Sequence, residues 1–186
     1  MAISELFTIF KTMSIVKKIM FLSALIATGF LISCNKHTVE GTSFLEVRLT
    51  DAPGPYDSVF VQVIGVSVHT DAGGWQQLAA DSGYYDLLTL QNGVDTLLAA
   101  SQIVPSGRIS QVRLILGDSN RVVVAGMSYP LSLSSQDETG LKCNLDTVLP
   151  AGSTARLLLD FDADQSVLQQ GNGSYRLKPV VSASFQ

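Results

Sequence analysis

The sequence has 186 residues, of which 46% are hydrophobic, with 12 basic and 16 acidic side chains and a formal net charge of −4. This length is enough for one domain with a sizeable core. A mildly acidic chain without a basic cluster argues against nucleic acid as a partner and against electrostatic adhesion to anionic lipid head groups.

The first third of the chain has the three-part layout of a secretory signal. Lys17 and Lys18 precede an uncharged run that ends at Ser33, and Cys34 follows. Residues 1–33 are therefore predicted to be a signal peptide, and Met13 is a better start than Met1 for a signal of this kind.

The four residues Leu31-Ile32-Ser33-Cys34 resemble the lipobox of bacterial lipoproteins. The resemblance implies a diacylglyceryl group on the Cys34 sulfur, cleavage after Ser33, and anchoring to a membrane of a bacterial cell envelope, with the outer membrane expected. An uncleaved membrane helix needs roughly 20 apolar residues, whereas the run from Ile19 to Cys34 has 16. A plain cleaved signal is the third alternative.

Residues 34–43 are predicted to form the lipidated N-terminus and a polar tether, and residues 44–186 a β-sandwich domain. Removing Glu5, Lys11, Lys17 and Lys18 with the signal leaves 9 basic and 15 acidic residues, a net charge of −6.

The domain is predicted to be all-β because short stretches alternate between apolar and polar residues and are separated by turn residues. A break in the alternation at Gly65 indicates a bulge, and Val94–Ser101 has helical spacing and is predicted to form the one short helix. Pro179 within the last strand indicates an edge position or a bulge. The remaining predicted strands are Phe44–Thr50, Ser58–His69, Trp75–Ala79, Tyr84–Leu90, Ile109–Leu116, Arg121–Ala125, Met127–Leu133, Leu141–Leu145, Thr154–Asp162, Val167–Gln170 and Tyr175–Phe185.

Several motifs together resemble the bacterial domain-of-unknown-function family DUF4382, which is common in secreted lipoproteins. They are Thr50-Asp51-Ala52-Pro53, Asp86-Leu87-Leu88, Gly107-Arg-Ile-Ser-Gln-Val-Arg-Leu, Leu159-Asp-Phe-Asp-Ala-Asp164 with Ser166-Val167, and Tyr175-Arg-Leu-Lys-Pro179. The resemblance implies a single antiparallel β-sandwich of transthyretin-like or immunoglobulin-like type, and it implies no activity and no site.

The sharpest chemical feature is the run Asp160-x-Asp162-x-Asp164. At strand spacing the three carboxylates share one face, and hard oxygen ligands suit Ca²⁺. Asp51 is a further candidate ligand. The alternative is a solvated strand end, and the EF-hand pattern fails because Gln165 stands where glycine is needed.

Three aromatic residues, Trp75, Tyr84 and Tyr85, are candidates for a sugar-stacking platform, although alternating aromatics on strands are more often core or cross-strand pairs. Cys143 is expected to be a reduced, buried thiol because Cys34 carries lipid.

The sequence therefore predicts a lipid-anchored, non-enzymatic envelope module that binds an unknown envelope protein or glycan or has a structural role. The alternatives are an envelope hydrolase that uses the carboxylates of Asp160, Asp162 and Asp164, and a calcium-dependent adhesion or glycan-binding module.

Overall fold

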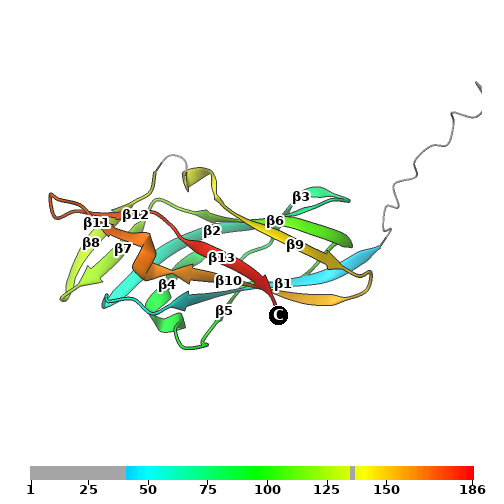
Figure 1. Ribbon diagram of the computed structural model, residues 1–186, viewed down its shortest axis with the longest axis horizontal. Helices are drawn as coiled ribbons and strands as arrows, with labels where there is room; N and C mark the ends of the chain where they lie inside the picture. The colour runs from blue at the N-terminus through cyan, green and yellow to red at the C-terminus, as the bar shows by residue number, and fades with distance from the viewer. Residues whose placement is uncertain (1–40, 135–136) are drawn as a thin grey trace, which may run out of the picture. The chain divides into compact units, whose positions relative to one another are not determined.

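A computed structural model describes residues 41–134 and 137–186. The described chain folds into two β-sheets that pack face to face, with one short α-helix, which confirms the predicted all-β sandwich (Figure 1). Within these residues no helix is long and apolar enough to cross a membrane.

The smaller sheet has four strands in the order β13-β10-β1-β5. These strands are β1 (Thr42–Ala52), β5 (Thr96–Pro105), β10 (Thr154–Asp162) and β13 (Val181–Phe185). The two central strands, β1 and β10, are parallel, so the expectation of a wholly antiparallel sandwich is wrong for this pair.

The larger sheet has nine strands and is built around β2, which has neighbours along both edges. β3 and β4 pair with one edge of β2, and β6 and β7 pair with the other. The parallel pair in this sheet joins β8 and β12. The strands are β2 (Ser58–Thr70), β3 (Gly74–Leu78), β4 (Gly83–Asp86), β6 (Gly107–Leu116), β7 (Asn120–Val124), β8 (Met127–Ser132), β9 (Leu141–Leu149), β11 (Val167–Gln169) and β12 (Tyr175–Leu177).

The core lies between the two sheets. It is formed mainly by every second residue along each strand, whose side chain points inward. In β1, Leu45, Val47 and Leu49 are fully buried. Beside them in the same sheet lie the inner side chains of β10, and across the core lie those of β2 and β6. This part of the core includes Leu157, Leu159 and Phe161 from β10, and Val59, Val61, Val63, Ile109 and Leu114 from the larger sheet.

The helix predicted at Val94–Ser101 is wrong, because this segment belongs to β5. The register between β1 and β5 shifts at Val47, and Leu98 and Ala99 are both buried as a result. A bulge of this kind interrupts the period of two, so the apolar residues fall at intervals that imitate a helix.

The α-helix that is present is a single turn, α3 (Ala163–Ser166), directly after β10. The described residues also include two 3-10 turns, η2 (Leu87–Leu90), where the Tyr84 strand was expected to continue, and η3 (Asp137–Thr139). The predicted bulge at Gly65 is confirmed by a register shift between β2 and β6. β7 and β8 pair as a hairpin around Gly126.

The predicted last strand is divided at Pro179 into β12 and β13, which belong to different sheets. Proline cannot donate a ladder hydrogen bond, and the chain changes sheets at this residue. The chain also changes sheets at α3, between β10 and β11.

Candidate functional site

The predicted lipidation site, Cys34, lies outside the described residues, as do the signal peptide and most of the tether. Lipidation therefore stays a prediction from the sequence.

The three acids of the Asp160 motif do not share one strand face. Asp160 and Asp162 lie on the outer side of β10, whereas Asp164 lies in α3 because the strand ends at Asp162. The Asp162 carboxylate caps α3: it accepts a hydrogen bond from the Gln165 backbone N–H at 2.9 Å and another from the Gln165 side-chain amide. In the part of the chain that the structure describes, no group of three or more His, Cys, Asp or Glu side chains could hold a metal ion.

Asp51, the candidate fourth ligand, points to the opposite side of the sheet from Asp160 and Asp162, into the end of the core, and it is 4% exposed. Its Oδ1 atom accepts a hydrogen bond from the Ala163 backbone N–H at 2.9 Å. Its Oδ2 atom and the buried Nε2 atom of Gln91 are close enough to interact and to lower the pKa of Asp51, but they do not meet the geometry of a regular hydrogen bond.

The pKa of Asp51 is raised to about 6, mainly by burial; the Ala163 N–H and the Gln91 side chain oppose this shift, and the charges of Asp162 and Asp160 contribute to it. Burial is also the main cause that raises the pKa of Asp160, followed by the charge of Asp162. The carboxyl group of Asp51 is therefore part of the packed interior. In the Asp160-x-Asp162-x-Asp164 motif, Asp160 lies at the end of a strand and Asp162 caps a helix.

The three candidate aromatic residues are not brought together. Trp75 pairs with His69 of β2, and Tyr84 pairs with Gln62 of the same strand. His69 and Gln62 are seven positions apart, so the two aromatic residues are separated by about 20 Å along β2 at the usual rise per residue. Tyr85 faces the core, where its hydroxyl donates to the Asp81 carbonyl at 2.5 Å. A single stacking platform of all three residues is therefore not formed.

Trp75 instead belongs to a set of side chains on the outer face of the larger sheet, which we name the outer grid. The register of β3, β2, β6 and β9 places four of them in one row across the sheet and two in the neighbouring row. The outer grid consists of Trp75, His69, Gln111 and Asn144 in the first row, and Arg113 and Lys142 in the second.

Short contacts hold the outer grid together. The Arg113 guanidinium carbon lies 4.2 Å from the centre of the Trp75 ring, and the His69 ring meets Trp75 edge-on at 5.3 Å. The Nδ1 atom of His69 is 2.9 Å from the Ser110 hydroxyl, and the Gln111 amide donates to Asn144 at the same distance. Sequence reasoning found only Trp75, because the other members come together through the strand register.

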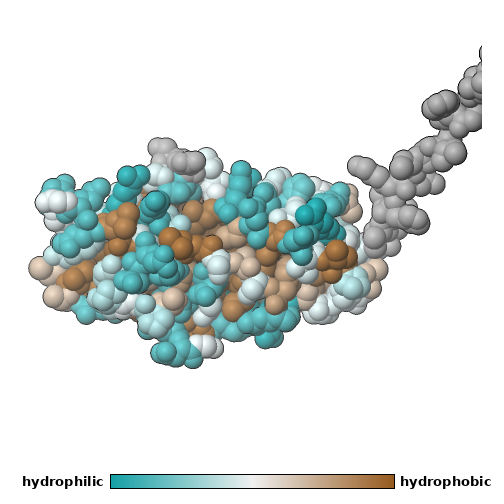
Figure 2. All heavy atoms as spheres, in the orientation of Figure 1, coloured by the Kyte–Doolittle hydropathy of each residue, from teal (hydrophilic) through white to brown (hydrophobic). Residues whose placement is uncertain are grey.

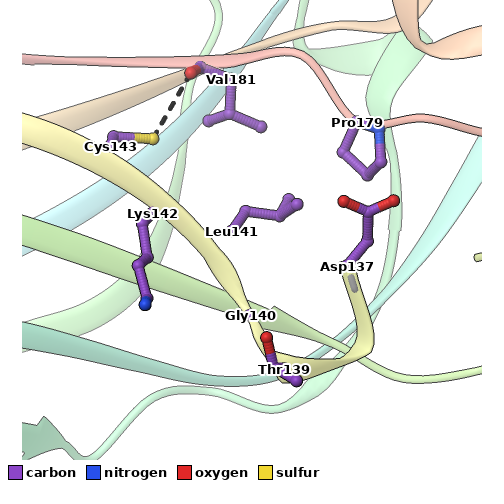
Figure 3. Close-up of a pocket in the computed structure, with 8 residues that line it drawn as sticks. All are labelled: Asp137, Thr139, Gly140, Leu141, Lys142, Cys143, Pro179 and Val181. Carbon is purple, nitrogen blue, oxygen red and sulfur yellow. Dashed lines mark hydrogen bonds between the residues drawn. The ribbon is translucent and has the colours of Figure 1, made fainter. Parts of the chain in front are cut away.

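A cavity of about 350 Å³ opens between β9 and the segment that carries Pro179 and Val181 (Figure 3). The Cys143 thiol donates to the Val181 carbonyl across this gap at 3.3 Å, and burial raises its pKa. Cys143 is free and buried, as predicted from the sequence. A thiol in this environment stays protonated, so it is a poor nucleophile.

Figure 2 shows that hydrophilic residues cover much of the face it draws and that hydrophobic residues form small separate groups. Small separate groups of this kind are ordinary on a protein surface and do not by themselves mark an interface.

A family model described as a domain of unknown function, DUF4382, matches residues 42–179. The match covers nearly the whole described domain, from the first residue of β1 to the break before β13. Neither the curated proteins nor the solved structures contain a match.

Proposed function

The chain belongs to the domain-of-unknown-function family DUF4382, and from this premise we propose that it is a lipid-anchored lipoprotein of the bacterial cell envelope. In this proposal its β-sandwich is a non-enzymatic module that binds an envelope protein or a glycan, or has a structural role.

The observation that carries the proposal is the run Leu31-Ile32-Ser33-Cys34 behind two lysines and an apolar segment. One acyl chain holds a protein to a bilayer only reversibly, and two or three chains on one residue make the anchor nearly permanent. Seven residues separate Cys34 from the start of β1 at Thr42. A chain of that length spans at most about 25 Å, so the anchor would keep the sandwich close to the membrane surface.

The described side chains support binding over catalysis. The Asp162 carboxylate is used as a helix cap, and the Asp51 carboxyl is closed off inside the fold. The cavity beside Cys143 and a smaller one of about 220 Å³ beside Glu46 are lined by neither Asp160, Asp162 nor Asp164. A hydrolase based on these acids needs a general acid and a general base facing a common substrate, and this arrangement does not supply them.

The test is to express the full chain in a bacterium that processes lipoproteins and to feed a palmitate analogue. The wild-type protein should be labelled and should partition into a detergent phase, and Cys34→Ala should lose both properties. Cys143→Ala is the matched control, because it removes the other cysteine of the chain and should retain the label.

Labelling that persists in Cys34→Ala would contradict the proposed anchor. Absence of label from the wild-type chain under conditions that label a known lipoprotein would contradict it equally.

A further inference from the structure

Two positive side chains of the outer grid lie directly opposite each other without a counter-ion. Arg113 on β6 pairs with Lys142 on β9, which places their Cβ atoms about 5 Å apart. Among the side chains that the structure describes, neither forms an ion pair, as is also true of Arg121, Arg176 and Lys178, whereas Arg48, Arg108 and Arg156 do. Like charges directly opposite each other destabilise a sheet. The presence of Arg113 and Lys142 at these positions is therefore not explained by a contribution to stability.

Arg113 is held in a fixed position by its surroundings. Arg113 pairs with Ser67 in the register of β2 and β6, and its guanidinium stacks on Trp75. At Gly140, whose φ is +100°, a Cβ atom would lie 2.7 Å from the Cγ and Cδ atoms of Arg113, so only glycine leaves room for the arginine stem.

The Arg113 guanidinium is held in position, and its terminal nitrogens, not its buried Nε atom, are the donors that a surface ligand would meet. Its Nε atom is buried and has no hydrogen-bond partner within the described residues. Stacking on Trp75 fixes the plane of the guanidinium, and a planar guanidinium matches a carboxylate through two parallel hydrogen bonds. Because the Arg113 side chain is already ordered in the free protein, it loses less conformational entropy when it binds an anion.

Lys142 presents its charge to the same side. It is exposed, and it alternates along β9 with Leu141 and the buried Cys143. Lys142 also contributes to the rim of the cavity beside Cys143 (Figure 3). The carboxylate of Asp146, further along β9, is already paired with Arg108 at 2.8 Å.

The first row of the outer grid supplies neutral groups beside the two cations. Trp75 is 39% exposed, and the His69 imidazole and the Gln111 and Asn144 amides can donate or accept hydrogen bonds. Four strands span about 14 Å, which suits a short oligosaccharide lying across the sheet.

We propose that the outer grid binds an acidic saccharide, with a sugar carboxylate on Arg113 and Lys142 and a sugar ring against Trp75. The inference rests on the proposed role of the domain as a binding module, and it names the ligand class. A neutral glycan would leave the two cations without a partner. Nucleic acid would require more phosphate contacts than two cations provide.

The test uses the full chain, purified in a detergent without a sugar head group, and measures binding of trigalacturonic acid by calorimetry. Maltotriose, which has no carboxylate, is the neutral comparison. We expect the acidic trisaccharide to bind, the neutral one to bind at least about tenfold more weakly, and the affinity to fall with added salt.

Arg113→Met should weaken binding of trigalacturonic acid by about tenfold or more, the size of a lost charge-assisted hydrogen bond. Lys142→Gln should weaken it in the same direction. Arg121→Met is the matched control, because the Arg121 guanidinium also stacks on an aromatic ring, that of Phe60 at 4.0 Å, but lies on β7 outside the outer grid. It should leave the affinity unchanged.

The inference is overturned if trigalacturonic acid does not bind, if maltotriose binds equally well, or if both Arg113→Met and Lys142→Gln bind as the wild type does. Because Arg113 is packed, each variant is first compared with the wild type by circular dichroism. Lys142→Gln, at an exposed position, keeps the test valid if Arg113→Met does not fold. Palmitate labelling of the same preparations reports on the lipid anchor separately, so the two proposals can fail independently.

Discussion

Replacing Asp51 with asparagine tests the buried carboxyl at the end of β1. Its pKa is raised from 3.8 to about 6, mainly by burial. A carboxyl that binds its proton more tightly in the folded chain than in the unfolded chain adds stability as the pH falls through about 6 toward about 4. That difference in pKa corresponds to about 3 kcal/mol in the free energy of unfolding, as an order of magnitude.

Asparagine at this position keeps an oxygen that can accept the 2.9 Å hydrogen bond from the Ala163 N–H, and it removes the charge. At about pH 4 the wild type is largely protonated in the folded state, so variant and wild type should be similar in stability to within about 1 kcal/mol. By about pH 8 the wild type carries a buried charge that the variant lacks. The stability of Asp51→Asn relative to wild type should therefore rise by about 3 kcal/mol between these two pH values.

The measurement is urea unfolding of the chain from Gly41 onward at several pH values. Asp164→Asn, at an exposed position in α3, is the control, and its difference from the wild type should stay nearly constant. A difference between Asp51→Asn and wild type that does not grow with pH would refute the reasoning, because the titration of Asp51 would then not be coupled to folding.

Two further predictions concern Cys143 and the acidic motif. In the chain from Gly41 onward, Cys143 should react slowly with a thiol reagent until the protein is unfolded, because it is buried and its pKa is raised; fast labelling of the native protein would mean that the thiol is accessible. The melting midpoint should be the same in millimolar calcium, in magnesium and in chelator at equal ionic strength, because Asp162 already accepts hydrogen bonds from Gln165 and caps α3. A rise of several degrees in calcium alone would instead indicate a metal site at Asp160, Asp162 and Asp164.

The sequence was a good guide to which segments are strands and a poor guide to how they pair. Alternation of apolar and polar residues depends only on the nearest neighbours along the chain, and it correctly located strands such as β1, β2 and β10. The parallel pairing of β1 with β10 joins residues about 110 positions apart, and nothing local in either segment encodes it.

The errors in the candidate sites have the same origin. Asp164 was expected to share a face with Asp160, but that expectation required the strand to continue, and a cap at Asp162 ends it. A platform of Trp75 and Tyr84 would require their strands to lie side by side, yet the two strands pair with opposite ends of the long strand β2. The outer grid depends on three successive registers, so only its individual residue types are visible in the sequence.

The motifs on which the family resemblance rests fall at two different places in the fold. Asp51, Asp162 and Ser166 meet at the point where the chain changes sheets. There the Ser166 hydroxyl donates to the Asp162 carbonyl and accepts from the Val180 backbone N–H at 2.8 Å. The Ser166 carbonyl accepts a hydrogen bond from the Lys178 backbone N–H at 2.8 Å. These bonds join the crossover at α3 to the crossover at Pro179. This group of motifs therefore has a structural role, because it holds together the two segments where the chain changes sheets.

The motif Gly107-Arg-Ile-Ser-Gln-Val-Arg-Leu has a different location, because it forms most of β6. Its apolar members, Ile109, Val112 and Leu114, enter the core, and a register shift between Ile109 and Gln111 turns Ser110, Gln111 and Arg113 to the outer face. Packing in the core explains the apolar members of the motif. It does not explain Arg113, which is stacked on Trp75 and whose Nε atom has no hydrogen-bond acceptor among the described residues. The proposed binding of an acidic saccharide rests on that residue, which is why the affinity of Arg113→Met for such a ligand is the decisive measurement.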